Sequence, residues 1–141
     1  MNLRLVTLDG TALDQEVYEV ILPTTEGEIA IFPDHEALVT LAAPGVMTIR
    51  RNKTDDDNHL EHFAISGGVI EVSQNTVRVL VDSADHSDDI AEADSKAALE
   101  RALKMRDEAK DQVDREKALQ LIDRHEVRLK VAELKRRRRQ Q

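Results

Sequence analysis

The chain has 141 residues, enough for one domain, or one domain with an appendage, around a modest core. It contains no cysteine, which excludes disulfides, iron–sulfur clusters and thiol catalysis. Its formal net charge is −8, and no stretch approaches the ~18 consecutive apolar residues of a membrane helix. We therefore expect a soluble chain that associates with a membrane only through partners.

Glycine, proline and charge divide the chain into two parts. All five glycines and all three prolines lie before Val69, and these residues mark turns. Residues 1–87 carry five basic and fifteen acidic side chains, whereas residues 88–141 carry fifteen basic and thirteen acidic ones. We expect two domains with these bounds, an acidic one and one with a basic end.

The first part shows short period-two patterns between turn signals, which is typical of strands. The patterns are expected to form strands, in chain order, at 3–5, 18–22, 46–49, 63–65, 69–72 and 77–81. The second of these segments is more continuously apolar, so it could be buried on both faces. So many short strands predict an antiparallel β-sandwich.

Residues 27–45 are expected to form a rigid, surface-facing loop on this sandwich. A strand at the start of the stretch must end at Phe32, because Pro33 fixes φ and lacks a backbone N–H. The two residues that follow should lie on an exposed corner. A short apolar run, 38–41, should then re-enter the core before a Pro-Gly pair turns the chain again.

The apolar spacing changes to steps of three and four from Ile90 onward, which predicts helices. One stripe consists of Ala98, Ala102, Met105, Ala109 and Val113, and a second of Ala118, Leu121 or Ile122, His125, Leu129 and Ala132. A break is expected between Asp111 and Asp114, where Asp114 could cap the second helix. One continuous helix stays an alternative, because the break has neither Gly nor Pro. The predicted fold class is α+β, an N-terminal antiparallel β-sandwich followed by a C-terminal α-helical hairpin.

Three local features suggest chemistry, and each has a simpler explanation. Residues 55–59 offer oxygen and nitrogen ligands, but Leu60 stands where a calcium loop needs glycine, so a solvated hairpin tip is expected. The Ser-Gly-Gly segment 66–68 lacks the preceding glycine of a nucleophile elbow. The five histidines lack a pair at metal-ligand spacing on one helix face. We expect no catalytic residue, cofactor or metal site.

A run of basic side chains ends the second helix: Lys135, Arg136, Arg137, Arg138 and Arg139. Such a run either complements the helix dipole and aids solubility, or binds an acidic partner. Nucleic acid is disfavoured, because the three aromatic residues all lie in the acidic part and no stacking platform accompanies the charge. A protein partner is therefore favoured.

Three motifs carry a resemblance to a known family. They are Gly-Glu-Ile-Ala-Ile-Phe-Pro-Asp-His-Glu-Ala-Leu-Val-Thr at 27–40, Pro-Gly-Val at 44–46 and Ile-Ser-Gly-Gly-Val-Ile-Glu-Val at 65–72. Together they resemble the epsilon subunit of bacterial F-type ATP synthases, called delta in mitochondria. Ala30 and Asp34 stand where that family commonly has glycine. The resemblance covers the whole chain.

The resemblance implies a non-catalytic rotor subunit at the cytoplasmic face of the bacterial plasma membrane. In that family the sandwich docks on the gamma subunit and on polar loops of the c-ring. Glu28 matches the acidic position associated with the c-ring and His35 the histidine near gamma, and Phe32 and Asp34 complete the expected docking corner. The hairpin can fold against the sandwich or extend toward the alpha/beta catalytic head, where residues 135–139 would meet acidic segments and block ATP hydrolysis.

Some members of that family bind ATP through an Ile-Asp-x-x-Arg-Ala motif. The matching residues here, 90–95, read Ile-Ala-Glu-Ala-Asp-Ser and lack both the Asp and the Arg of the motif. An acid stands where phosphate needs a cation, so we expect no ATP sensing. The alternative to a rotor subunit is a free-standing sandwich-plus-hairpin adaptor that binds another acidic protein.

Overall fold

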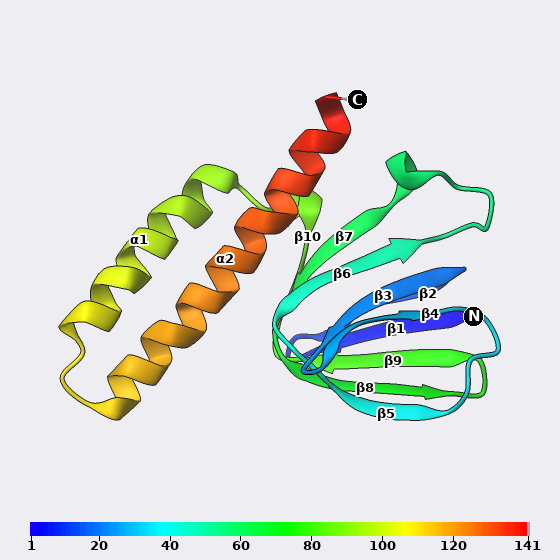
Figure 1. Ribbon diagram of the computed structural model, residues 1–141, viewed down its shortest axis with the longest axis horizontal. Coiled ribbons are helices and arrows are strands. Elements are labelled where there is room, and N and C mark those ends of the chain that lie inside the picture. The colour runs from blue at the N-terminus through cyan, green and yellow to red at the C-terminus, as the bar shows by residue number, and fades with distance from the viewer. Residues whose placement is uncertain (141) are drawn as a thin grey trace.

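The computed structural model describes residues 1–140, and of these the side chains of residues 1–137. Ten strands precede two helices in this part of the chain (Figure 1). The strands are β1 (Asn2–Thr7), β2 (Gly10–Glu16), β3 (Glu19–Thr24), β4 (Gly27–Ile31), β5 (Leu38–Ala42), β6 (Gly45–Arg50), β7 (Glu61–Ile65), β8 (Gly68–Ser73), β9 (Thr76–Val81) and β10 (Ala84–His86). The helices are α1 (Glu92–Glu108) and α2 (Gln112–Gln140), with short 3₁₀ turns η1 (Asp57–His59) and η2 (Ser87–Asp89).

The strands fold into a sandwich, and the predicted α+β class is confirmed. Hydrogen bonds order them β10-β7-β6-β3-β5-β8-β9-β1-β2, and β4 also pairs with β3. The pairs are antiparallel except β1 with β9, which is parallel. Strands β2, β5 and β10 are additions to the sequence-based expectation, and β5 lies within the stretch expected to be a surface loop. Strands β2 and β10 lie at the two ends of the strand order, where a polar or very short strand is common.

The core lies between the strands and follows the predicted alternation. Leu3 and Leu5 of β1 are fully buried, while Arg4 between them is exposed. Strand β3 alternates too: Val20 and Leu22 are fully buried, and Ile21 between them is only partly covered. The main buried cluster runs from Met1 to Val81. Burial of this apolar surface is the chief term that stabilises the sandwich.

The expectation that residues 38–41 re-enter the core is half wrong. Leu38 packs against the core and Ala42 is buried within it, but Val39 is 74% exposed and Leu41 is 58% exposed. The reason is the period of two in a strand, which sends successive side chains to opposite faces. Apolar residues at consecutive positions therefore leave an apolar face outside.

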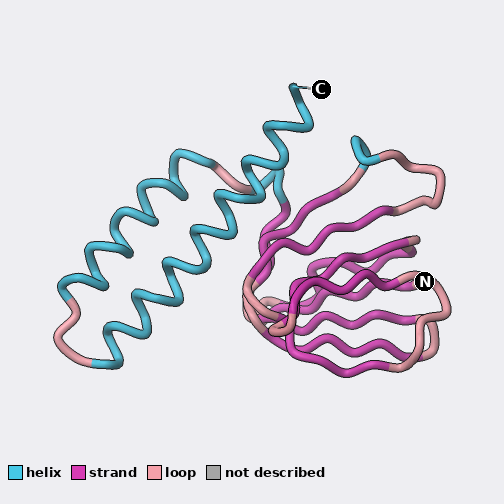
Figure 2. The backbone as a smooth tube through the Cα atoms, in the orientation of Figure 1, coloured by secondary structure: helices cyan, strands magenta, loops and turns pink. Residues whose placement is uncertain are grey.

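The two helices form the predicted hairpin (Figure 2). Asp111 accepts a hydrogen bond from the Asp114 backbone N–H (2.8 Å), so Asp111 caps α2, and the expectation that Asp114 does so is wrong. The buried hairpin residues include Ala102, Ala118, Ile122 and Ala132, as the stripes predict. Met105 and Val113 are exposed instead. For Val113 the reason is that the helix break falls before it and places it on the first turn of α2.

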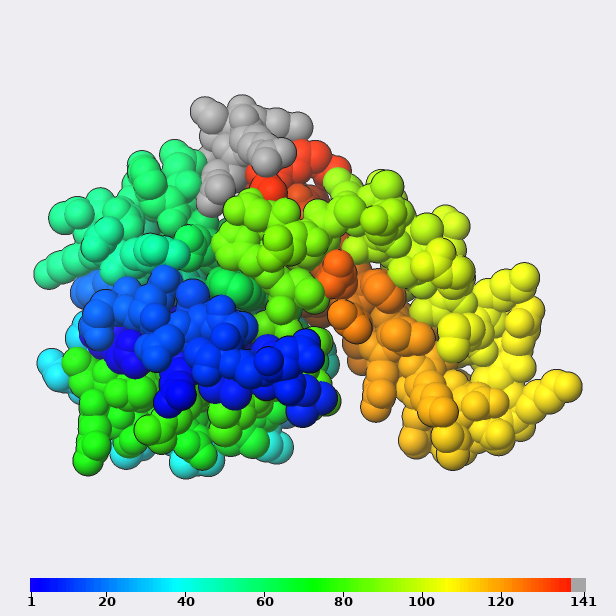
Figure 3. Space-filling view, turned by 180° about the vertical axis from the view of Figure 1, so that it is seen from behind, coloured from blue at the N-terminus to red at the C-terminus, as the bar shows by residue number. Residues whose placement is uncertain are grey.

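The hairpin docks on the sandwich through α2, which lies between α1 and the sheet (Figure 1). Val131 of α2 is fully buried against Val46 of β6 and Ala64 of β7, and Ile90, Val127 and Leu134 pack around them. Seen from behind, the hairpin projects sideways from the sandwich (Figure 3). The apolar contact between the two parts is therefore small.

We expect Gly68→Ala to destabilise the chain by about 3 kcal/mol, because overpacking forces backbone shifts. A Cβ at this position would overlap the carbonyl oxygen of Leu80 on β9 and lie 3.0 Å from the Val81 Cα. Urea denaturation of the Gly68→Ala variant and of the unmodified chain measures the difference in their free energies of unfolding. Ser73→Ala, at the exposed end of the same strand, is the control and should change stability by within ~0.5 kcal/mol. Equal midpoints for both variants would contradict the packing argument.

Candidate docking surfaces

Phe32, Asp34 and His35 lie beyond the end of β4, and we call them the His35 corner. Asp34 has φ 64°, a left-handed conformation that Asp tolerates better than most residues. Its backbone N–H donates to Asn75 Oδ1 (2.9 Å) in the β8–β9 turn. The Phe32 ring packs edge-on against Tyr18 at 5.6 Å between centroids. The corner is exposed but held in place from two sides.

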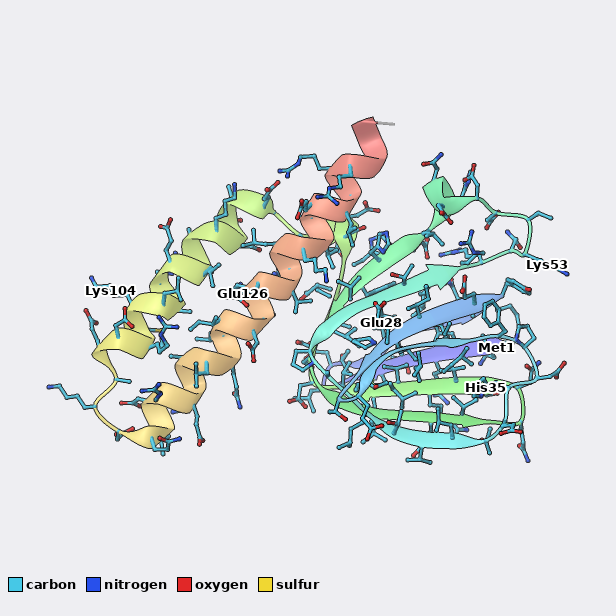
Figure 4. The ribbon with its side chains drawn as sticks, viewed as in Figure 1. Met1, Glu28, His35, Lys53, Lys104 and Glu126 are labelled. Carbon is cyan, nitrogen blue, oxygen red and sulfur yellow. The ribbon has the colours of Figure 1, made fainter. Side chains whose placement is uncertain are left out.

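Glu28 lies at the other end of β4, where it is paired with Pro23 of β3. An extended strand rises by ~3.3 Å per residue, which puts about 13 Å of backbone between Glu28 and Phe32. Figure 4 shows Glu28 nearer the helices and His35 at the far end of the sandwich. The single docking corner expected from the sequence is thus two separate surfaces, because an intervening strand keeps them apart.

An apolar stripe crosses the outer face of the sheet, and sequence reasoning missed it. We call it the outer stripe; it consists of Val6, Val39, Leu41, Val69 and Leu80. Leu41 is paired with Val69, Val69 with Leu80, and Leu80 with Val6. Side chains paired in this way lie on one face. The signal that could have found it is in β5, where Leu38 and Ala42 on one face alternate with Val39 and Leu41 on the other, so that both faces carry apolar residues.

The outer stripe begins beside the His35 corner. Val39 of the stripe lies four residues after His35 and directly follows Leu38, which is paired with Val72 near the turn that contains Asn75. Asn75 in turn accepts the hydrogen bond from Asp34. Exposed contiguous apolar surface of this kind typically marks an interaction site. Corner and stripe together offer one surface with an apolar centre and a polar end.

The basic end of α2 is engaged within the chain. Lys135 Nζ lies 2.7 Å from Asp88 Oδ1, and Arg136 Nη1 lies 2.8 Å from Glu92 Oε1. Arg137 pairs with Glu133, one helical turn before it, at 2.7 Å. The side chains of Arg138 and Arg139, which the sequence also places in this site, lie outside those described.

Arg128 is a further basic residue of α2 that sequence reasoning missed. Its Nη1 lies 2.6 Å from Asp85 Oδ2 of β10, and its Nε donates to Ser95 Oγ of α1 at 3.4 Å. The side chains of Arg128 and Asp85 are only 17% and 25% exposed, and Ser95 is buried. Arg124 reaches the same Asp85 carboxylate at 3.9 Å. One guanidinium therefore joins α2 to both the sandwich and α1.

Arg50 holds the acidic loop at 55–59 between β6 and β7. The Arg50 guanidinium donates to the Asp55 carbonyl (2.6 Å) and pairs with Asp57 (2.8 Å) and Glu19 (3.0 Å). His59 hydrogen-bonds Asp56 at 2.7 Å and so lowers the pKa of that carboxyl. Among the described residues, no group of three His, Cys, Asp or Glu side chains is placed to hold a metal ion.

His125 of α2 is partly buried, and charged side chains of α1, α2 and β10 are near enough to act on its ring. Its Nδ1 is buried and makes no hydrogen bond within the described structure. Burial lowers the pKa of the imidazole, and the charges of Arg124, Arg128 and Arg101 lower it further, while Asp85 acts in the opposite sense. The packed hairpin therefore prefers the neutral ring.

None of the helices in the described part of the chain is both long and apolar enough to cross a membrane.

Comparison with known sequences places the chain in a family. A family model described as "ATP synthase, Delta/Epsilon chain, beta-sandwich domain" matches residues 1–87. The chain therefore belongs to the ATP synthase delta/epsilon family, in agreement with its sequence motifs.

Two relatives within this family are bacterial proteins named ATP synthase epsilon chain. The relative from Rippkaea orientalis is 36% identical over 135 residues, which cover 94% of this chain and 96% of that one. The relative from Herpetosiphon aurantiacus is 36% identical over 141 residues, with 98% of each chain covered. The likeness thus includes the helical hairpin as well as the sandwich.

Solved structures resemble the same fold. A chain in the mitochondrial ATP synthase of Euglena gracilis, from a structure of its OSCP/F1/c-ring assembly, matches with a TM-score of 0.76 at 26% identity. That match covers 92% of this chain and 79% of the other. A chain from the central stalk and c-ring of the Tetrahymena thermophila enzyme matches with a TM-score of 0.57 at 17% identity, over 92% and 94% of the two chains. The second likeness shows the fold alone.

We expect acidification to weaken the packing of the hairpin through His125. Below its ordinary pKa of about 6.5 an open hairpin binds a proton that the packed one excludes. The contribution of the neutral ring is therefore complete above about pH 6.5 and is lost as the pH falls. Thermal unfolding at about pH 7.5 and about pH 5.5 measures it.

His125→Gln should show a smaller loss of melting temperature between these two pH values than the unmodified chain. His35→Gln, on an exposed loop, is the matched control and should keep the full loss. The argument is wrong if His125→Gln and the unmodified chain lose the same amount.

Proposed function

We propose that this chain is a central-stalk, or rotor, subunit of an F-type ATP synthase. It couples ion flow to ATP synthesis by docking on the gamma subunit and on loops of the c-ring. The observation that carries this proposal is the near-full-length identity with bacterial ATP synthase epsilon chains. A free-standing adaptor would share the fold but would not account for that identity. The subunit works at the cytoplasmic face of the plasma membrane, is held there by the complex, and leaves catalysis to other chains.

Two separate surfaces suit two partners in this proposal. The c-ring loops contact the end of the sandwich that carries Glu28. Gamma contacts the His35 corner and the outer stripe, which form one continuous surface. A stable interface buries ~800 Å² on each partner, and three loop residues alone are too few for that. The exposed apolar side chains of Val39 and Leu41 supply the apolar centre that such an interface needs.

Replacing His35 by alanine should weaken binding to purified gamma about fivefold, since interface side chains outside the central hot spot each contribute roughly 1 kcal/mol. Leu41→Ser should weaken it by at least as much. Stability should change by within ~0.5 kcal/mol for the His35 variant, because the residue is exposed. Binding by titration calorimetry and unfolding by circular dichroism give the two readings.

Glu28→Gln is the matched control, because it lies at the other end of β4. It should leave gamma binding unchanged and lower only proton-coupled ATP synthesis in the assembled enzyme. Gamma binding that is unaffected by both His35→Ala and Leu41→Ser would remove this surface from the gamma interface.

The hairpin acts as an inhibitor of ATP hydrolysis in this proposal. Detached from the sandwich and extended along gamma, α2 would bring residues 135–139 to acidic segments of the alpha/beta catalytic head. The small apolar contact around Val131 supports such a movement, because the docked and extended arrangements then differ by only a few kcal/mol.

Alanine at all five positions from Lys135 to Arg139 should relieve inhibition of hydrolysis in the reconstituted enzyme without lowering ATP synthesis. The effect should shrink as ionic strength rises, because exposed charge pairs are screened by salt. Lys104→Ala, an exposed cation on α1 whose pair is a neighbour on the same helix, should have no effect. Hydrolysis rates that do not respond to the alanine run would leave the basic end as a solubilising helix terminus.

A further inference from the structure

Three carboxylates of the stretch that joins the sandwich to α1 each pair with a basic side chain of α2. Asp85 of β10 pairs with Arg128 at 2.6 Å. Asp88 of η2 pairs with Lys135 at 2.7 Å, and Glu92 at the start of α1 pairs with Arg136 at 2.8 Å. We call these three carboxylates the acidic latch.

The spacing of the cations matches the latch. Lys135 and Arg136 lie seven and eight residues after Arg128, which is about two helical turns, so Lys135 shares the face of Arg128 and Arg136 lies about 80° around the helix from it. Arg136 therefore reaches the start of α1. Val131 lies between Arg128 and Lys135 on the face of these two cations and is buried against β6 and β7. Because the carboxylates come from three consecutive elements, they meet the cations in one register of α2 along the sandwich. The latch therefore specifies where α2 docks.

The three pairs differ in exposure. Arg128 and Asp85 are both largely covered, whereas each of the other pairs has one exposed member: Asp88 is 63% exposed beside a covered Lys135, and Arg136 is 52% exposed beside Glu92. Asp88 also lies 3.5 Å from the His86 ring, and Glu92 lies 3.7 Å from Lys96. Salt screens exposed pairs more than covered ones. The end of α2 is therefore held by salt-sensitive contacts and its middle by a protected one.

We propose that the acidic latch is an intramolecular binding site that occupies the cations of α2 and so competes with an external acidic partner. Lys135 and Arg136 cannot satisfy both sets of carboxylates at once. Opening begins at the exposed pairs and is completed when Arg128 leaves Asp85. The identity of the competing partner rests on the proposed function, whereas the latch itself is a property of the isolated chain.

Spin labels can measure the opening, because the chain has no cysteine of its own. Labels are placed on Ser73→Cys in the sandwich and Gln120→Cys in α2, both exposed. Asp88→Asn with Glu92→Gln should raise the population at long distance about two- to fivefold for each pair removed. High salt should reduce the difference between this variant and the unmodified chain. Asp85→Asn should raise the long-distance population more than either of these changes, because the covered Arg128 then loses its closest partner.

Asp89→Asn is the matched control, since that carboxylate lies within the same segment and pairs with none of the described basic side chains of α2. It should leave the distances unchanged. Unchanged distances in the latch variants, or an equal change with Asp89→Asn, would overturn the latch.

Rates of ATP hydrolysis by the reconstituted enzyme test the proposed inhibitory role separately from the latch. The Asp88→Asn and Glu92→Gln chain keeps every cation, so it should inhibit hydrolysis more strongly than the unmodified chain, opposite to the alanine run. If the distances lengthen while inhibition stays the same, the latch stands and the inhibitory role fails. If inhibition increases without any change of distance in the isolated chain, the latch is wrong.

Discussion

The hydrophobic core of the sandwich is separate from the helices, and the strength with which the hairpin docks on the sandwich depends on this separation. The main buried cluster draws its described members from Met1 to Val81. The hairpin adds a separate, smaller cluster centred on Val131. Since the burial of apolar area sets the free energy of docking, a small contact leaves charge pairs with a large share in holding α2. Neither helix contributes any of its described side chains to the main cluster of the sandwich.

The acidic sandwich and the basic end of the hairpin attract each other in this arrangement. The acidic side chains near the end of the sandwich face the basic side of α2, so the two parts attract each other across the Asp85 and Asp88 contacts. The pair of Arg128 with Asp85 is protected from solvent, and the pair of Lys135 with Asp88 is more exposed. The same basic residues serve the docked hairpin and, in the proposed function, the extended one.

Strand β4 places the proposed contacts for two partners at opposite ends of one rigid body. Glu28 at its start and the His35 corner beyond its end cannot meet the same small surface. The corner is stiffened by the hydrogen bond from Asp34 to Asn75 and by the packing of Phe32 on Tyr18. In the proposed function, a subunit that transmits rotation needs such stiffness between its contacts, because a flexible link would absorb the motion.

The sequence alone determined the sandwich, the hairpin and the family, because periodicity and turn chemistry are properties of a few neighbouring residues. It also predicted that residues 34 and 35 are exposed. Only the tertiary structure decided which strands pair, that β1 lies parallel to β9, and which face of β5 is outside. It alone matched Asp34 with Asn75, 41 residues away, and Arg136 with Glu92, 44 residues away. Such partners are set by the three-dimensional path of the chain, which no local pattern records.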